Sequence, residues 1–142
     1  MLYFDHSATT PIHSDVLSLI NELNQDIYGN PSSIHSAGRK AKHVVETARK
    51  QIAASINCTP KEIIFTGGGS EANNLVLWNM MYRDQKHVIT SAIEHPAILA
   101  VLKQLEHLGI SHTIIPVNKY GWVNPEDIDA AIRESTGLIS IM

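Results

Sequence analysis

The chain contains 142 residues, 44% of them hydrophobic, which is enough for one buried core of about a domain's size. A net charge of −3 with scattered lysines and arginines gives no indication of a nucleic-acid or membrane surface. No apolar run approaches the roughly 18 residues of a membrane span, and a single cysteine excludes an internal disulfide. These features predict a cytoplasmic protein without nucleic-acid or membrane partners.

Residues 1–61 are predicted to form an N-terminal arm and two lead-in helices. A short extended piece at residues 2–4 opens the arm. Apolar residues then recur at helical spacing over about 12–27, which predicts an amphipathic helix. Glycine, asparagine and proline at 29–31 interrupt it, and a second, longer helix with one apolar stripe follows over 37–56.

Residues 62–142 alternate between strand-like and helix-like patterns. Strands are predicted at 63–66, 87–90, 113–117 and 137–142, and helices at 70–82, at 96–108 and from Asn124-Pro125 onward. Nearly continuous apolar strands alternating with helices predict an α/β layer on a largely parallel sheet flanked by helices. A chain that stops on a buried strand would leave one sheet face uncovered, so we expect a piece of a longer protein or one half of a pair.

Three glycines separate the strand predicted at 63–66 from the helix that follows it. Glycines at 67–69 would let an anion approach the free N–H groups of the first helical turn, and Ser70 can add a hydroxyl. The segment therefore predicts an anion cradle, most readily for a phosphate. The alternative is a tight turn in which Ser70 caps the helix and Glu71 interacts with its dipole.

A histidine follows the next predicted strand at the same sheet edge. His95 stands directly before Pro96, where its imidazole could lie over a bound ligand or act as an acid or base. The alternative is a residue at the helix start that is hydrogen-bonded to backbone. Two further polar loops, 5–10 and 29–35, are as compatible with connecting turns as with function.

Metal and thiol chemistry find little support in the sequence. The chain has eight histidines, but no helical histidine pair is joined by a third ligand at a suitable spacing, so no metal site is predicted. Cys58 has no basic or histidine partner that would activate it, and we expect an inert residue at a helix end. The lysines fall on polar helix faces or in turns.

Five motifs together resemble the cysteine desulfurases of the NifS/IscS group, within the class V aminotransferase family of pyridoxal-phosphate enzymes with fold type I. They are Tyr-Phe-Asp-His-Ser-Ala-Thr-Thr-Pro at 3–11, Gly-Asn-Pro-Ser-Ser-Ile-His at 29–35, Phe-Thr-Gly-Gly-Gly-Ser-Glu-Ala-Asn-Asn at 65–74, Ile-Glu-His at 93–95 and Leu-Ile-Ser-Ile-Met at 138–142. The resemblance implies that residues 62–142 are the first half of the large, pyridoxal-phosphate-binding domain.

The resemblance also implies residue roles. Gly69 and Ser70 would hold the phosphate of pyridoxal 5'-phosphate, and His95 would stack on the cofactor ring and handle protons as the catalytic residue. Thr9, Asn30 and His35 would border the site. The phosphate turn departs from the family's usual Thr-Ser-Gly-Ala-Thr-Glu in carrying Gly67, Gly69 and Ser70, a small change that keeps a hydroxyl.

Relatives of this kind convert L-cysteine to L-alanine and pass persulfide sulfur to acceptor or scaffold proteins, for iron–sulfur clusters or tRNA thiolation, as homodimers. The family segments with the Schiff-base lysine and the nucleophilic cysteine find no match before Met142. The resemblance therefore implies an N-terminal fragment that is inactive alone.

Three alternatives stay open at the level of sequence. Another class V enzyme, such as a selenocysteine lyase or an aminotransferase, would share the cofactor but act on another substrate. A non-catalytic partner or split-subunit half would use the uncovered sheet edge for association. A simple nucleotide-binding α/β domain would use the glycine turn for a nucleotide phosphate.

Overall fold

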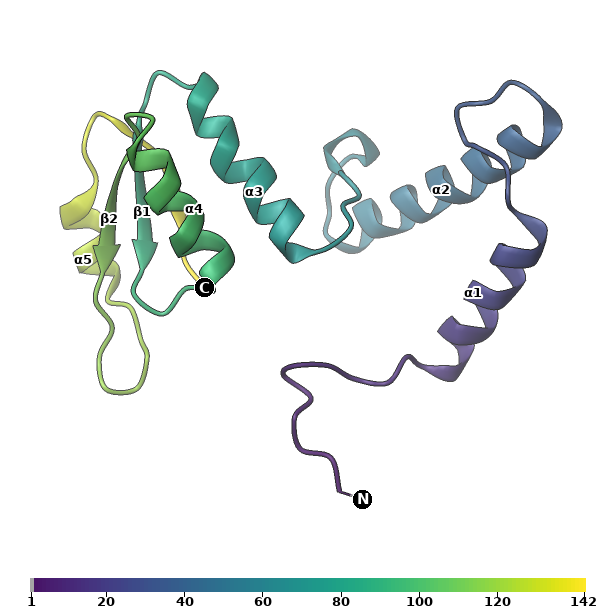
Figure 1. The fold of residues 1–142 in the computed structure, drawn as a ribbon, viewed down its shortest axis with the longest axis horizontal. Helices are drawn as coiled ribbons and strands as arrows, with labels where there is room; N and C mark the ends of the chain where they lie inside the picture. The colour runs from purple at the N-terminus through teal and green to yellow at the C-terminus, as the bar shows by residue number, and fades with distance from the viewer. Residues whose placement is uncertain (1) are drawn as a thin grey trace. The chain divides into compact units, whose positions relative to one another are not determined.

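Residues 2–142 are described by a computed structural model, in which the chain divides into two compact units (Figure 1). The first unit ends at Ile64 and the second runs from Phe65 to Met142. Three helical elements make up the first unit and a three-stranded sheet with its helices makes up the second.

The first unit contains α1 (Ser14–Asp26), α2 (Ser36–Ser55) and the short 3-10 helix η1 (Pro60–Glu62), in agreement with the two predicted helices. The loop between α1 and α2 packs tightly against the start of α2. A Cβ atom at Gly29 would lie 2.4 Å from the carbonyl carbon of Ala37, and one at Gly38 would lie 2.4 Å from the carbonyl oxygen of Ser33. Both positions therefore require glycine for close backbone approach.

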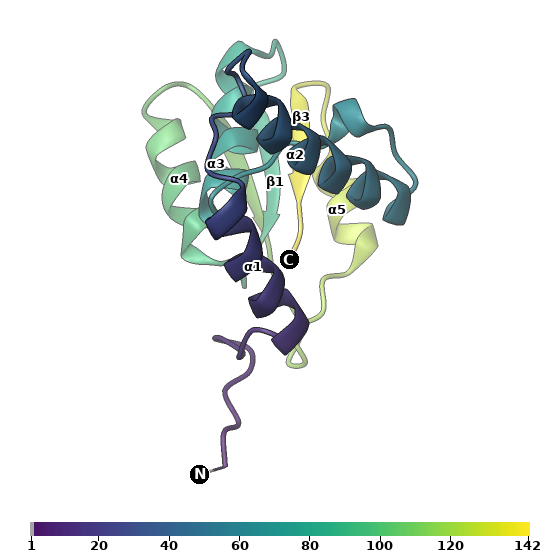
Figure 2. The same cartoon turned by 90° about the vertical axis from the view of Figure 1, so that its right-hand side faces the viewer.

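The second unit is built on three parallel strands in the order β2-β1-β3. Both neighbours pair with β1, and α4 and α5 lie on opposite sides of the sheet (Figures 1 and 2). The elements are α3 (Gly69–Asn79), the 3-10 helix η2 (Met80–Tyr82), β1 (His87–Ser91), α4 (Pro96–Glu106), β2 (Ser111–Ile115), α5 (Pro125–Ala131) and β3 (Thr136–Ser140). The predicted α/β class and parallel sheet are confirmed.

The core of this unit lies between the sheet and helices α3 and α4. Leu77 and Met80 from the α3 side, Leu102 and Leu105 from α4, and Val88 from β1 are all buried in it. The apolar residues of α4 recur at helical spacing and so form one inward face, as the sequence predicted. This packing fixes α3 and α4, the two helices whose first residues carry the predicted site, within a single unit.

The strand predicted at 63–66 is wrong. Ile63 has an extended backbone, with φ −89° and ψ 126°, but the segment pairs with no strand among residues 2–142. Ile64 and Phe65 are 69% and 45% exposed, respectively. An apolar, β-branched run predicts extended backbone, whereas a strand also requires a neighbour with which to pair.

A buried histidine at the amino end of β1 ties the three strands together. His87 Nδ1 lies 2.8 Å from Thr136 Oγ1 on β3, and its Nε2 lies 2.9 Å from Thr113 Oγ1 on β2. The pairing of β1 with β3 skips Gly137 at this point, where a Cβ atom would lie 2.8 Å from the carbonyl oxygen of Gln85. Burial, aided by Arg133 and His112, lowers the pKa of His87.

This arrangement makes stability dependent on pH. The unfolded chain binds a proton at His87 below about pH 6.5, whereas the folded chain resists protonation down to its lowered pKa. The free energy of unfolding should therefore fall as pH drops below about 6.5 and level off below the folded-state pKa. Replacing His87→Gln should cost about 1–3 kcal/mol at neutral pH, because it breaks the buried bridge, and should remove this pH dependence.

Urea denaturation from pH 5 to pH 8 would measure both effects, with His107→Gln as the control because His107 is exposed at the end of α4. An unchanged pH slope in His87→Gln would show that the dependence has another source.

Candidate active site

The glycine turn leads directly into α3, and the helix begins without a side-chain cap. Gly68 occupies the N-cap position, with extended backbone, and no side chain accepts from the first turn. The carbonyl oxygen of Gly68 accepts the first helical hydrogen bond from Ala72 N–H at 3.1 Å. Within residues 2–142, the amides of Gly69, Ser70 and Glu71 have no protein acceptor. Three N–H groups are thus left at the positive end of the helix dipole.

One amide of the turn is already bonded to a side chain. Gly67 N–H donates to Glu71 Oε2 at 2.6 Å, and Thr66 Oγ1 donates to the carbonyl oxygen of Gly68 at 3.2 Å. Glu71 therefore binds the backbone before the helix in addition to lying near its dipole. Ser70 lies one residue inside the helix, so the alternative in which Ser70 is the N-cap is wrong.

The space beside Gly68 and Gly69 is open. A Cβ atom added at Gly68 or Gly69 would meet no other atom within 4 Å, whereas one at Gly67 would lie 3.0 Å from Glu71 Oε2. Gly68 and Gly69 thus leave open volume beside unpaired N–H donors. Packing within the described chain does not require glycine at either position. Unpaired amides, open space and the Ser70 hydroxyl together suit an anion with several oxygen acceptors.

His95 is itself the N-cap of α4. Its Nδ1 accepts from Ala97 N–H at 3.1 Å, and Pro96 occupies the first helical position. In the neutral ring this acceptor role assigns the proton to Nε2. The imidazole is exposed at the carboxyl edge of β1. The alternative in which His95 is hydrogen-bonded to backbone at the helix start is therefore correct for Nδ1. The other ring nitrogen, Nε2, remains available to a ligand.

The other predicted site residues belong to the first unit. The carbonyl oxygen of Thr9 accepts from the Tyr3 hydroxyl at 3.1 Å, and Asn30 Oδ1 accepts from Ser32 N–H at 2.8 Å. His35 is the N-cap of α2, with Nδ1 accepting from Gly38 N–H at 3.3 Å. The structure therefore places Gly69, Ser70 and His95 in the second unit. Thr9, Asn30 and His35 have local structural roles in the first unit.

A buried acid beside His95 was missed by the sequence reasoning. Glu94 is 9% exposed and accepts from the Ser91 hydroxyl at 2.8 Å. The available signal was its place directly after a buried strand and before a candidate histidine. Burial itself was not visible in the pattern, because Glu94 occupies a turn and belongs to no periodic segment.

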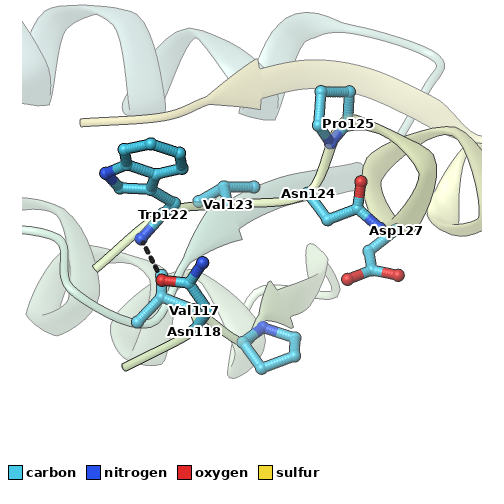
Figure 3. Close-up of a pocket in the computed structure, with 8 residues that line it drawn as sticks. Val117, Asn118, Trp122, Val123, Asn124, Pro125 and Asp127 are labelled. Atoms are coloured by element: carbon cyan, nitrogen blue, oxygen red, sulfur yellow. Dashed lines mark hydrogen bonds between the residues drawn. The ribbon is translucent and has the colours of Figure 1, made fainter. Parts of the chain in front are cut away.

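A cavity of about 520 Å³, lined by none of these residues, lies between the loop after β2 and the start of α5 (Figure 3). Pro116, Val117, Asn118, Trp122, Val123, Asn124, Pro125 and Asp127 line it. Trp122 N–H donates to Asn118 Oδ1 at 3.1 Å, and Asp127 is the only titratable residue in its lining. It has neither the donors of the glycine turn nor a histidine.

Among residues 2–142, no group of three or more histidine, cysteine, aspartate or glutamate residues is arranged to hold a metal ion. No helix in the same residues has the length and apolar character to span a membrane. Cys58 is half-buried and free.

The sequence matches the family described as aminotransferase class-V over residues 2–142. Over 99% of its length it is 42% identical to the cysteine desulfurase IscS of Dictyoglomus turgidum and to that of Methanosarcina thermophila. In both cases it spans 36% of the relative's length.

Solved structures agree. A NifS-like protein superposes with a TM-score of 0.92 at 33% identity, covering 99% of this chain and 39% of the other. A structure of SspA in complex with cysteine superposes with a TM-score of 0.89 at 35% identity, covering 98% of this chain and 41% of the other. The resemblance and the fold type drawn from the motifs are confirmed.

Substitution by alanine should affect the stability of the chain differently at Gly69 and at Gly38. Gly69→Ala should leave stability unchanged or raise it by up to about 1 kcal/mol, since alanine is the better helix former and meets nothing. Gly38→Ala should destabilise by about 1–3 kcal/mol or more, because its Cβ overlaps backbone atoms. Thermal unfolding would compare them, and equal losses in both variants would contradict the distinction.

Proposed function

Because this chain belongs to the aminotransferase class-V family, we propose that it forms the phosphate-binding part of a pyridoxal-phosphate-dependent cysteine desulfurase. The observation that carries the proposal is the uncapped start of α3, with free amides at Gly69, Ser70 and Glu71. We further propose that residues 1–61 are the arm and lead-in helices, and that residues 62–142 are the first half of the large domain.

The anion preference follows from the charges at the turn. A dianionic phosphate at a helix N-terminus gains from the dipole by about 0.3–1 kcal/mol and from each charge-assisted hydrogen bond by about 1.5–3 kcal/mol. Gly69 and Ser70 would donate backbone N–H groups, and the Ser70 hydroxyl would add a further donor. The Glu71 carboxylate would keep its place on Gly67 N–H, which holds the turn in shape.

Pyridoxal phosphate, when bound, supplies an electron sink for bonds at the substrate's α-carbon. The part of this chain is to bind and orient it. His95 would lie against the cofactor ring, and because Ala97 N–H occupies Nδ1, a proton would be given or taken at Nε2. The imidazole would thereby act as a positioned acid or base.

The names of the relatives support L-cysteine as the substrate, with L-alanine and transferable sulfur as products. Sulfur acceptors or scaffold proteins of iron–sulfur cluster assembly or tRNA thiolation would be the partners, and the full-length form would be a cytoplasmic homodimer. The chain matches just over a third of the relatives' length. We therefore propose that the 142-residue chain alone binds the cofactor weakly and does not turn over cysteine.

Two substitutions separate the phosphate contact from the ring contact. Ser70→Ala should weaken binding of both inorganic phosphate and pyridoxal phosphate about ten- to a hundredfold, because it removes one hydrogen bond to a charged group. His95→Ala should weaken pyridoxal phosphate about tenfold, by loss of ring stacking, and leave inorganic phosphate unchanged. Titration followed by ³¹P NMR would measure both ligands.

Ser55→Ala is the matched control, since its hydroxyl donates to Ile52 O at the end of α2. ATP as a third ligand tests the nucleotide alternative, and it should bind no more tightly than inorganic phosphate. Unchanged pyridoxal phosphate affinity in both Ser70→Ala and His95→Ala would remove the site assignment.

A further inference from the structure

Glu94 is a buried acid that the proposed chemistry does not use. Four polar residues of the described chain are buried, namely His87, Thr90, Ser91 and Glu94, and Glu94 is the one carboxylate among them. It lies in the turn that leaves β1 and enters α4, directly before His95. A buried carboxylate is costly unless hydrogen bonds satisfy it, so its contacts indicate why it is there.

Both hydrogen bonds of Glu94 meet at one oxygen. Its Oε1 accepts from the Ser91 hydroxyl at 2.8 Å and from Met142 N–H at 2.5 Å. Ser91 is the last residue of β1, and Met142 lies two residues past the end of β3. The carboxylate therefore continues the connection between these two strands beyond the point where their backbone ladder stops.

The same turn is tied to the other neighbour of β1 through its backbone. Ala92 N–H donates to the carbonyl oxygen of Ile115, the last residue of β2, at 2.9 Å. The turn over residues 92–95 is thus held on one side by a backbone bond and on the other side by the Glu94 carboxylate. Without Glu94 it would keep only the tie to β2.

The position of the His95 ring follows from that turn. His95 has φ −61° and ψ 147°, Pro96 fixes the first residue of α4, and Ala97 N–H occupies Nδ1. Few torsions remain between the Glu94 carboxylate and the imidazole. A shift of the turn that the start of α4 does not share would move the ring away from Ala97 N–H and weaken the Nδ1 bond that sets its tautomer.

We propose that Glu94 is a positioning residue that holds the turn between β1 and α4 against β3, and so fixes the place and tautomer of the His95 imidazole. The proposal rests on the proposed function, since it concerns the ring that would meet the cofactor. A charge-assisted acceptor suits this role, because one oxygen serves two donors with short bonds.

The test reads the His95 ring directly in the full chain. Two-dimensional ¹H–¹⁵N spectra of the imidazole should show Nδ1 unprotonated and Nε2 protonated for the neutral ring. In Glu94→Ala the two nitrogens should move toward averaged shifts, and affinity for pyridoxal phosphate should fall about tenfold, as expected from losing about 1.4 kcal/mol. Affinity for inorganic phosphate at the Ser70 amide should not change, because α3 is untouched.

Glu94→Gln should rescue the tautomer and most of the affinity, since its amide oxygen can accept both bonds. Glu134→Ala, which removes an exposed acid before β3, is the matched control and should behave as the unmodified chain. A folded Glu94→Ala with an unaltered His95 tautomer would overturn the proposal, and so would a Glu94→Gln variant as impaired as Glu94→Ala.

Should Glu94→Ala fail to fold, Ser91→Ala carries the test, because it removes one of the two bonds and keeps the carboxylate. Ser91→Ala should weaken binding of pyridoxal phosphate without changing binding of inorganic phosphate. A pyridoxal phosphate affinity equal to that of the unmodified chain, or an equal loss for both ligands, would overturn the role. The His95 tautomer is measured without ligand. An unmodified chain that binds no pyridoxal phosphate would therefore refute the proposed function and leave the result on Glu94 standing.

Discussion

Parallel pairing of β1 with both of its neighbours is the constraint on which the second unit depends. Because the three strands point the same way, their carboxyl ends meet at one edge, and the segments leaving that edge are brought together. Side-chain and backbone hydrogen bonds brace both ends of β1. His87 joins the strands at the amino edge, and the turn with Ala92 and Glu94 joins them at the carboxyl edge.

The helix starts show how the chain treats unpaired amides. His13, His35, His95 and Asn124 cap α1, α2, α4 and α5, each accepting one N–H of the first turn. Among the α-helices of residues 2–142, only α3 begins with a residue that has no side chain to offer. The open start of α3 is where the proposed phosphate would find its donors, in a chain that caps its other α-helices with side chains.

The sequence predicted the features that depend on local pattern. Helix periodicity located α1, α2 and α4, the Asn124-Pro125 pair located the start of α5, and apolar runs located three strands. It also predicted that Ser70 and His95 each follow a strand, which is correct for His95 after β1 and wrong for Ser70, because residues 63–66 form no strand. It could not predict partners distant in the chain, such as the two threonines that bracket His87, or that residues 63–66 would belong to no strand of the described chain. Pairing and burial are properties of the assembled fold, whereas periodicity is a property of the local segment.

The glycines of the described chain fall into two groups, those that packing requires and those that packing does not require. At Gly29, Gly38 and Gly137 a side chain would collide with the chain's own backbone, so packing alone explains these residues. At Gly68 and Gly69 a side chain would meet nothing, and helix propensity would favour alanine at Gly69. Nothing inside the described chain accounts for glycine at these two positions. The family's usual turn carries alanine at the position of Gly69, so a ligand does not require glycine there either. The feature that bears on the proposed phosphate is the open space beside amides that the fold does not satisfy.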